Sequence, residues 1–176
     1  MAIQIGAKPD SGFDDPLGML KDCHRRIEKF LDILIVVAER AEDRGLTEEE
    51  KTAVEAALQY FRSGGQRHTA DEECSLFPRL RTGTLPPPAE LEALEADHRE
   101  SGELHDSVEA LYTGWAATGE LSAADRHRML VETRKLRHLY ARHIQIEETV
   151  VFPHAARALD SRTVAEIGLE FKARRR

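Results

Sequence analysis

The sequence has few of the features that would place it among secreted, fibrous or membrane-spanning proteins. Only two of its 176 residues are cysteines, Cys23 and Cys74, too few for a disulfide framework and consistent with a reducing compartment. No collagen-like or low-complexity segment occurs. The longest purely apolar run, residues 33–38, is far too short to cross a bilayer, and no basic region followed by an apolar run stands near Met1. These features predict a cytoplasmic protein.

Positive charge is also in the minority. Lysine and arginine number 25 against 32 aspartates and glutamates, which gives a net charge of −7. A field of this sign repels nucleic acid and anionic membranes, so we expect neither as a partner. The basic run from Lys172 to Arg176 is the exception, and we interpret it as a solvated helix end, where cations suit the helix dipole.

Strand-like alternation is absent, and apolar residues instead recur at helical steps of three and four. This spacing predicts long helices from about 15 to 45, from 47 to the break at residues 83–88, from 91 to 118, and from 122 onward. Short links between such segments favour an all-α, antiparallel up-down-up-down four-helix bundle, followed by a short C-terminal helix. We therefore predict an irregular leader (1–14), one bundle domain (15–159), and a short helix with a basic tail (160–176).

An internal repeat organises these helices. Residues 68–78 read HTADEECSLFP and residues 143–153 read HIQIEETVVFP, so His, Glu-Glu and Phe-Pro recur 75 positions apart. His24 and His98 lie 74 positions apart within the apolar stripes of the first and third helices. The repeat predicts approximate two-fold symmetry between the halves. Two positions break it, because Glu28 corresponds to Gly102 and Leu31 corresponds to His105.

The repeated histidines and glutamates predict a metal site. A residue four positions along a helix is turned by only about 40°, so His68 and Glu72 face the same part of the core, as do His143 and Glu147. Buried carboxylates are costly unless they are paired or bind metal, and no lysine or arginine occupies the core stripes. Dications would neutralise them. The predicted ligands are His24, His68, Glu72, His98, His143 and Glu147.

Counting donor atoms gives two ions. If each glutamate bridges both ions and each ion takes two histidines, an oxo or hydroxo bridge brings each ion to about five ligands and leaves one octahedral position open. Dioxygen, nitric oxide, peroxide or water could bind there. Histidine and carboxylate ligands without thiolate suit iron best, with manganese and zinc as alternatives.

With these residues the sequence resembles the hemerythrin-like, or HHE cation-binding, domain family over roughly residues 15–155. The resemblance implies a four-helix bundle that holds a non-haem di-iron centre, with the six residues above as ligands. Oxygen-carrying hemerythrins have a fifth histidine one turn after the third-helix ligand, where this sequence has Gly102. Four histidines with two bridging glutamates look more like the bacterial iron-centre repair proteins, which carry an additional N-terminal cysteine-containing domain.

The predicted function is therefore binding or sensing of a small ligand at a di-iron centre, or iron handling under oxidative or nitrosative stress. A di-iron oxidase or peroxidase is the enzymatic alternative, although the E-x-x-H motif of ferritin-like enzymes occurs only once, at Glu95 to His98. A purely structural bundle is the third reading. No catalytic residue is predicted.

Several residues near the predicted ligands are assigned other roles. Glu73 and Glu148 are turned by about 100° from the neighbouring glutamates, so we expect them at helix interfaces or hydrogen-bonded to a partner. Glu28 is a weaker ligand candidate, and Gly102 with His105 should mark the open side of the ion pair.

Both cysteines are expected to be buried. The Phe-Pro pairs should end or kink their helices, and the fourth helix should bury Leu136, Tyr140, His143, Glu147, Val150 and His154.

Overall fold

The structure is a computed structural model that describes residues 10–41 and 44–176. Every regular element in these residues is helical, which confirms the predicted all-α class. Residues 1–9 of the predicted leader lie outside the described part, and the division of the chain at 14 and 159 stays a prediction. The elements are α1 (Pro16–Ala41), α2 (Glu48–Tyr60), η1 (Phe61–Gly65), α3 (Gln66–Asp71), η2 (Glu72–Leu76), α4 (Phe77–Thr82), α5 (Leu91–Thr118), α6 (Ala123–Ile146), η3 (Glu147–Val151), α7 (Phe152–Ala158) and α8 (Ser161–Ala173).

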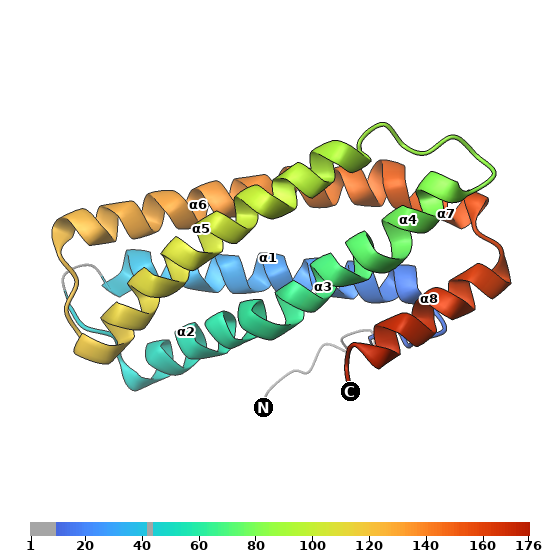
Figure 1. Ribbon diagram of the computed structural model, residues 1–176. Helices are drawn as coiled ribbons and strands as arrows, with labels where there is room; N and C mark the ends of the chain where they lie inside the picture. The colour runs from blue at the N-terminus through green and yellow to red at the C-terminus, as the bar shows by residue number, and fades with distance from the viewer. Residues whose placement is uncertain (1–9, 42–43) are drawn as a thin grey trace, which may run out of the picture.

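Four long helical segments lie side by side in Figure 1, and the chain reverses direction from each to the next. The first segment is α1, the second runs continuously from α2 to α4, the third is α5, and the fourth runs continuously from α6 to α7. Helix α1 packs against α2 and α6, and α5 packs against the same two helices. None of the helices in the described residues is long and apolar enough to cross a membrane.

The helix ends follow local signals in the sequence. The Thr47 hydroxyl accepts a hydrogen bond from the Glu50 backbone N–H, and the Glu50 carboxylate accepts one from the Thr47 N–H, a complete capping box at the start of α2. Ser122 caps α6 through the Asp125 N–H. Gly119 ends α5 in the left-handed region, with φ of 72°. These local features set where α2 and α6 begin and where α5 ends.

Two clusters of buried apolar side chains flank a polar centre. One fills the end near the α1–α2 and α5–α6 links and includes Val54, Trp115 and Met129. The other lies near α8 and includes Phe77 and Phe152. Along each long segment the buried histidine falls between residues of the two clusters. The polar centre is therefore enclosed by apolar packing on both sides, which keeps bulk water from it.

Each Phe-Pro pair follows a widened, π-helical turn rather than a helix end. The Phe77 N–H bonds to the Glu72 carbonyl oxygen, and the Phe152 N–H bonds to the Glu147 carbonyl oxygen. In a regular α-helix, the ring of a proline clashes with the carbonyl group four residues earlier. The wider turn gives that ring room, so the second and fourth segments continue to Thr82 and Ala158. Of the predicted alternatives, that these pairs end or kink their helices, the first was wrong, and both π turns begin at a predicted metal ligand.

The π turn also changes which residues face inward beyond Glu147. Val151 and Ala155 are fully buried, whereas Val150 is 38% exposed and His154 is only half-buried. The predicted stripe assumed uninterrupted α-helical spacing and named Val150 and His154. That part of the stripe was wrong because the π turn inserts one extra residue before the helix resumes.

The basic C-terminal residues are not a solvated helix end. Ile167 and Phe171 bury α8 against the second apolar cluster, and the chain then brings two arginines onto the second segment. Arg174 Nη1 lies 2.9 Å from Asp71 Oδ1, and Arg175 Nη2 lies 2.6 Å from Asp71 Oδ2. Asp71 is fully buried and directly precedes Glu72. The tail therefore neutralises a buried charge beside the polar centre.

Replacing Arg174 and Arg175 together with alanine would leave Asp71 buried without a cation. We expect the double variant to lose roughly 3 kcal/mol of unfolding free energy, the low end for a broken buried ion pair, because both arginines are partly exposed. The loss corresponds to a decrease in Tm of about 6–12 °C for a chain of this size. Thermal unfolding followed by circular dichroism measures it. Arg176→Ala is the matched control, since Arg176 is exposed; an equal loss there would show that Asp71 is not the cause.

Candidate metal centre

The structure brings all six predicted ligands together. They come from all four long segments and meet in one buried cluster between the two apolar clusters. His98 is the most exposed of the six, at 6% of its side chain. The residues are His24 on α1, His68 on α3, Glu72 at the start of η2, His98 on α5, His143 on α6 and Glu147 at the start of η3.

The Glu72 carboxylate lies between histidines of both halves. Its Oε1 lies 3.4 Å from His68 Nε2 and 4.0 Å from His24 Nε2. Its Oε2 lies 3.3 Å from His98 Nε2. One oxygen therefore faces the histidines of the first two segments, and the other faces His98 on the third.

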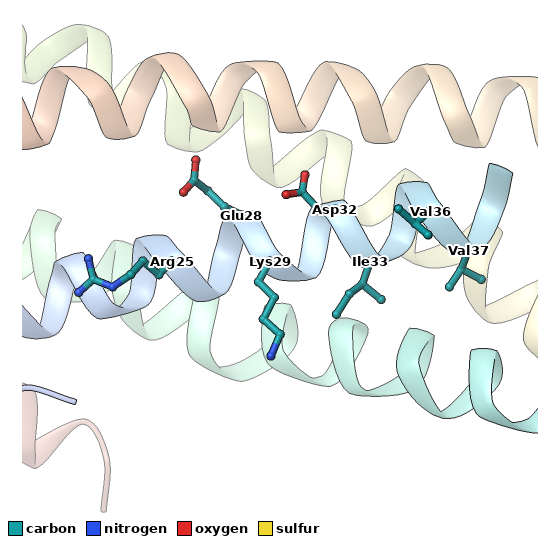
Figure 2. Close-up of a pocket in the computed structure, with 7 residues that line it drawn as sticks. All are labelled: Arg25, Glu28, Lys29, Asp32, Ile33, Val36 and Val37. Carbon is teal, nitrogen blue, oxygen red and sulfur yellow. The ribbon is translucent and has the colours of Figure 1, made fainter. Parts of the chain in front are cut away.

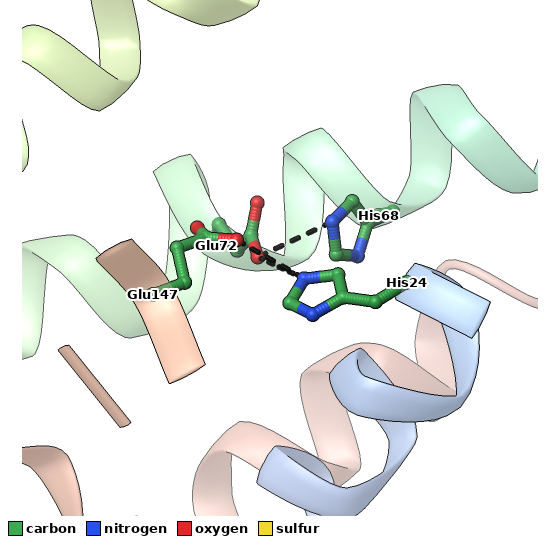
Figure 3. Close-up of side chains that lie close together, drawn as sticks. All are labelled: His24, His68, Glu72 and Glu147. Atoms are coloured by element: carbon green, nitrogen blue, oxygen red, sulfur yellow. Dashed lines mark ion pairs between the residues drawn. The ribbon is translucent and has the colours of Figure 1, made fainter. Parts of the chain in front are cut away.

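Glu147 repeats this arrangement from the opposite side. Its Oε2 lies 3.0 Å from His24 Nε2, and its Oε1 lies 3.3 Å from His143 Nε2. Figure 3 shows His24 and His68 directed at the two glutamates. The six residues thus form two four-residue groups that share Glu72 and Glu147, one with His24 and His68 and the other with His98 and His143, with donor atoms within 4.8 Å of one another in each.

The donor atoms of these groups fit metal ions. Both oxygens of Glu72 and of Glu147, and Nε2 of His24, His98 and His143, are buried without a hydrogen-bond partner. An unsatisfied buried polar atom costs about 1–3 kcal/mol, and more when it is charged. Ligands bonded to one ion at about 2.1 Å and at right angles lie about 3 Å apart, close to the nitrogen–oxygen distances here. Each group therefore offers two nitrogens and two oxygens to one ion.

A second layer of carboxylates orients two of the histidines. His24 Nδ1 lies 2.8 Å from Glu148 Oε1, and His98 Nδ1 lies 2.8 Å from Glu73 Oε1. Both bonds cross between segments, since Glu148 follows α6 and Glu73 follows α3. A hydrogen bond at Nδ1 fixes the ring with Nε2 toward the centre and makes that nitrogen a better ligand. The expectation that Glu73 and Glu148 hydrogen-bond a partner is confirmed.

The groups that lie near the histidine Nδ1 atoms differ between His143 and His68. Asp97 Oδ2 lies 3.5 Å from His143 Nδ1, and Asp97 is itself held by Arg142 at 2.5 Å. Neither His143 Nδ1 nor His68 Nδ1 makes a hydrogen bond, so Asp97 acts on His143 as a nearby charge. The repeat explains the difference, because the position equivalent to Asp97, 74 residues earlier, is Cys23. Sequence reasoning missed Asp97, although an acid directly before a core histidine was a visible signal.

Burial and close contacts shift the pKa values of the two glutamates in opposite directions. Burial, and next the charge of Glu147, raise the pKa of Glu72 well above its usual range. Burial also acts to raise the pKa of Glu147, but its close contacts with His143 and His24 hold that pKa well below the usual value. Burial alone would lower the pKa of His143, yet its contacts with Glu147 and Asp97 raise it. The pKa values of the two carboxyl groups are therefore shifted in opposite directions, and Glu72 is the one that holds a proton more readily.

Glu28 lies outside the cluster. Its Oε1 lies 3.4 Å from Arg137 Nη1, and Asp32 pairs with the same arginine at 2.8 Å. Figure 2 shows both carboxylates directed toward the neighbouring helix, above a shallow surface pocket on α1 that none of the six clustered residues lines.

Cys23 is buried as expected, but Cys74 is exposed, which corrects the sequence prediction. Cys74 lies within η2, two positions after Glu72.

Gly102 and His105 lie beside the cluster rather than in it. They line a pocket of about 280 Å³ together with His98 and Tyr140. His127 and His138 are exposed, as expected for residues off the buried stripes.

The all-helical fold and the twinned histidine–glutamate groups define a candidate dinuclear metal-binding protein. The family model of the hemerythrin HHE cation binding domain matches residues 15–155, and the chain belongs to this family. A protein of Haemophilus influenzae, described as uncharacterized, is 28% identical over 163 residues, which cover 93% of this chain and 91% of that protein.

Metal uptake should release protons. Glu72 and His143 hold their protons to a higher pH than the free groups do, because their pKa values are raised, and an ion must displace any proton on either one. We expect protons to be released on loading with dications, and binding to weaken as the pH falls. A titration in weakly buffered indicator solution measures this. Full metal loading without any change in pH would contradict the assigned protonation.

Proposed function

We propose that this protein is an antiparallel up-down-up-down four-helix bundle that holds two iron ions and binds a small ligand, such as dioxygen, nitric oxide or peroxide, at them. One ion would be held by His24 and His68 and the other by His98 and His143, with Glu72 and Glu147 bridging both. The observation that carries the proposal is the placement of one oxygen of each glutamate toward each histidine pair.

The buried negative charge of the two glutamates favours bound dications. Glu72 and Glu147 are fully buried, and no lysine or arginine of the described residues pairs with either one. The donor set contains imidazole and carboxylate but no thiolate, which favours iron over softer metals and leaves manganese and zinc as alternatives. When bound, the iron pair would supply a position for an exogenous ligand and a means of exchanging electrons with it.

The protein's own side chains would set the conditions at the ions. Glu73 and Glu148 hold two of the four imidazole rings with Nε2 inward, which keeps these ligands in place without rearrangement, and Asp97 places a charge near a third ring, that of His143. The stacked rings of Phe152 on His24 and of Phe77 on His98 cover the histidines from the α8 end. Apolar cover of this kind limits water at the ions and favours binding of a small uncharged ligand.

Metal content tests the site directly. Protein produced with added iron should contain about two ions per chain, and His68→Ala and Glu147→Ala should lose metal and thermal stability together, because buried ligands couple binding to folding. His138→Ala is the control, since His138 is an exposed histidine on α6. Less than about one ion per wild-type chain after iron supplementation would overturn the proposed centre.

A spectrum in air distinguishes ligand binding from catalysis. We expect the reduced, iron-loaded protein to develop a stable charge-transfer band on exposure to air, because the buried centre holds the ligand away from water. The band should disappear when oxygen is removed. Rapid irreversible oxidation with consumption of peroxide would instead favour the oxidase or peroxidase function.

A further inference from the structure

A pocket of about 280 Å³ opens beside the candidate metal centre, between the second and third long segments and next to α6. A volume of this size has room for several water molecules, at about 30 Å³ each, and lies just below the range typical of drug-sized ligands. Its walls include Phe61, Gly65, His98, Gly102, His105 and Tyr140. The pocket therefore suits a ligand of a few atoms.

The pocket exists where the two-fold symmetry of the repeat fails. Gly65 corresponds to Tyr140, 75 residues later, and Gly102 corresponds to Glu28, 74 residues earlier. A Cβ atom placed on Gly102 would meet nothing within 4 Å. On the symmetry-related side, Glu28 carries a side chain where the pocket has Gly102, and it pairs with Arg137. The pocket thus lies at positions where the two halves of the repeat differ.

The pocket reaches one ion position and not the other. His98 is the one residue of the six-residue cluster that lines it. His98 also has the most exposed side chain of the six, and its Nε2 is buried without a hydrogen-bond partner. His24 and His68, which would hold the other ion, do not line this pocket. Access from solvent therefore leads to the position between His98 and His143.

Tyr140 places a hydroxyl group in the same pocket. Its oxygen lies 3.1 Å from His105 Nε2, and its ring lies next to that of His143, with centroids 6.4 Å apart. Burial raises the pKa of Tyr140 to about 12 and lowers that of His105 to about 4, so both are neutral near pH 7. When His105 donates from Nε2 to the phenol oxygen, the phenol hydrogen is left to donate to a third group. A ligand in the pocket can accept it.

We propose that the exogenous ligand enters through this pocket, binds the ion held by His98 and His143, and accepts a hydrogen bond from Tyr140. The proposal rests on the metal pair proposed above and adds which ion is accessible and which side chain recognises the ligand. The ligand class is a molecule of two or three atoms with a terminal acceptor atom. The rim carries Arg62, Asp106 and Glu109, and Arg62 pairs with Glu109 at 2.7 Å, so it offers no concentrated positive charge for a larger anion.

Blocking the pocket tests the route, with azide as the probe of iron-loaded protein. Gly102→Leu fills the opening without a clash and favours the helix, so iron content and Tm should not decrease. Azide association, followed by stopped-flow absorbance, should slow on the order of tenfold or more. Gly114→Leu is the matched control, because Gly114 is also exposed on α5, meets nothing within 4 Å and lies outside the pocket.

Removing the phenol tests the hydrogen bond. Tyr140→Phe keeps the ring, and we expect azide to bind about 5–10-fold more weakly, mostly through faster dissociation. Tyr112→Phe is the control, since the buried Tyr112 hydroxyl donates to the Leu34 carbonyl oxygen far from the pocket. Its loss should lower stability and leave azide affinity unchanged.

The outcomes separate this proposal from the metal centre itself. If all variants hold two irons and azide binds Gly102→Leu as fast as Gly114→Leu, the route is wrong while the centre stands. If Tyr140→Phe and Tyr112→Phe bind azide equally, the assigned hydrogen bond is wrong. If the wild-type protein takes up no iron, the proposed function fails and this proposal fails with it.

Discussion

The burial of two carboxylates at one point is the constraint on which the rest of the structure depends. Glu72 and Glu147 are fully buried and have no hydrogen-bond partner at any of their four oxygens. Removing such charges from water is expensive, and the four histidines offset only part of that cost. Without cations, the buried charge of the two carboxylates is therefore not fully compensated. This is the physical reason to regard the centre as a metal site.

The surroundings of the two glutamates hold this costly arrangement in place. π-helical turns start at both and let the following prolines stay within continuous helices. Glu73 and Glu148 reach across to histidines on other segments, so each half of the repeat orients a ligand of the other half. The C-terminal arginines neutralise Asp71, next to Glu72. The π turns, the hydrogen bonds to Glu73 and Glu148, and the C-terminal arginines therefore all act within a few residues of Glu72 or Glu147.

Much of this could be predicted from the sequence because the signals were local or repeated. Helical periodicity fixed the all-α class, and the capping residues Thr47 and Ser122 marked helix starts. The repeat HxxxEE pointed to six residues that the fold does bring together. The errors came where one helix meets another. Val150 and His154 were misplaced by a π turn, Cys74 is exposed, and the basic tail is paired rather than solvated.

The sequence by itself determined the helical class, the family and the identity of the clustered residues, since periodicity and spacing within one helix depend only on the chain. The tertiary structure alone decided which oxygen faces which histidine, that Asp97 lies near His143, and which side of the centre is open. These features depend on distances between segments that are far apart in the chain, and no local pattern encodes them. The broken symmetry at Gly102 and His105 was visible in the sequence, but only packing made these residues part of one pocket.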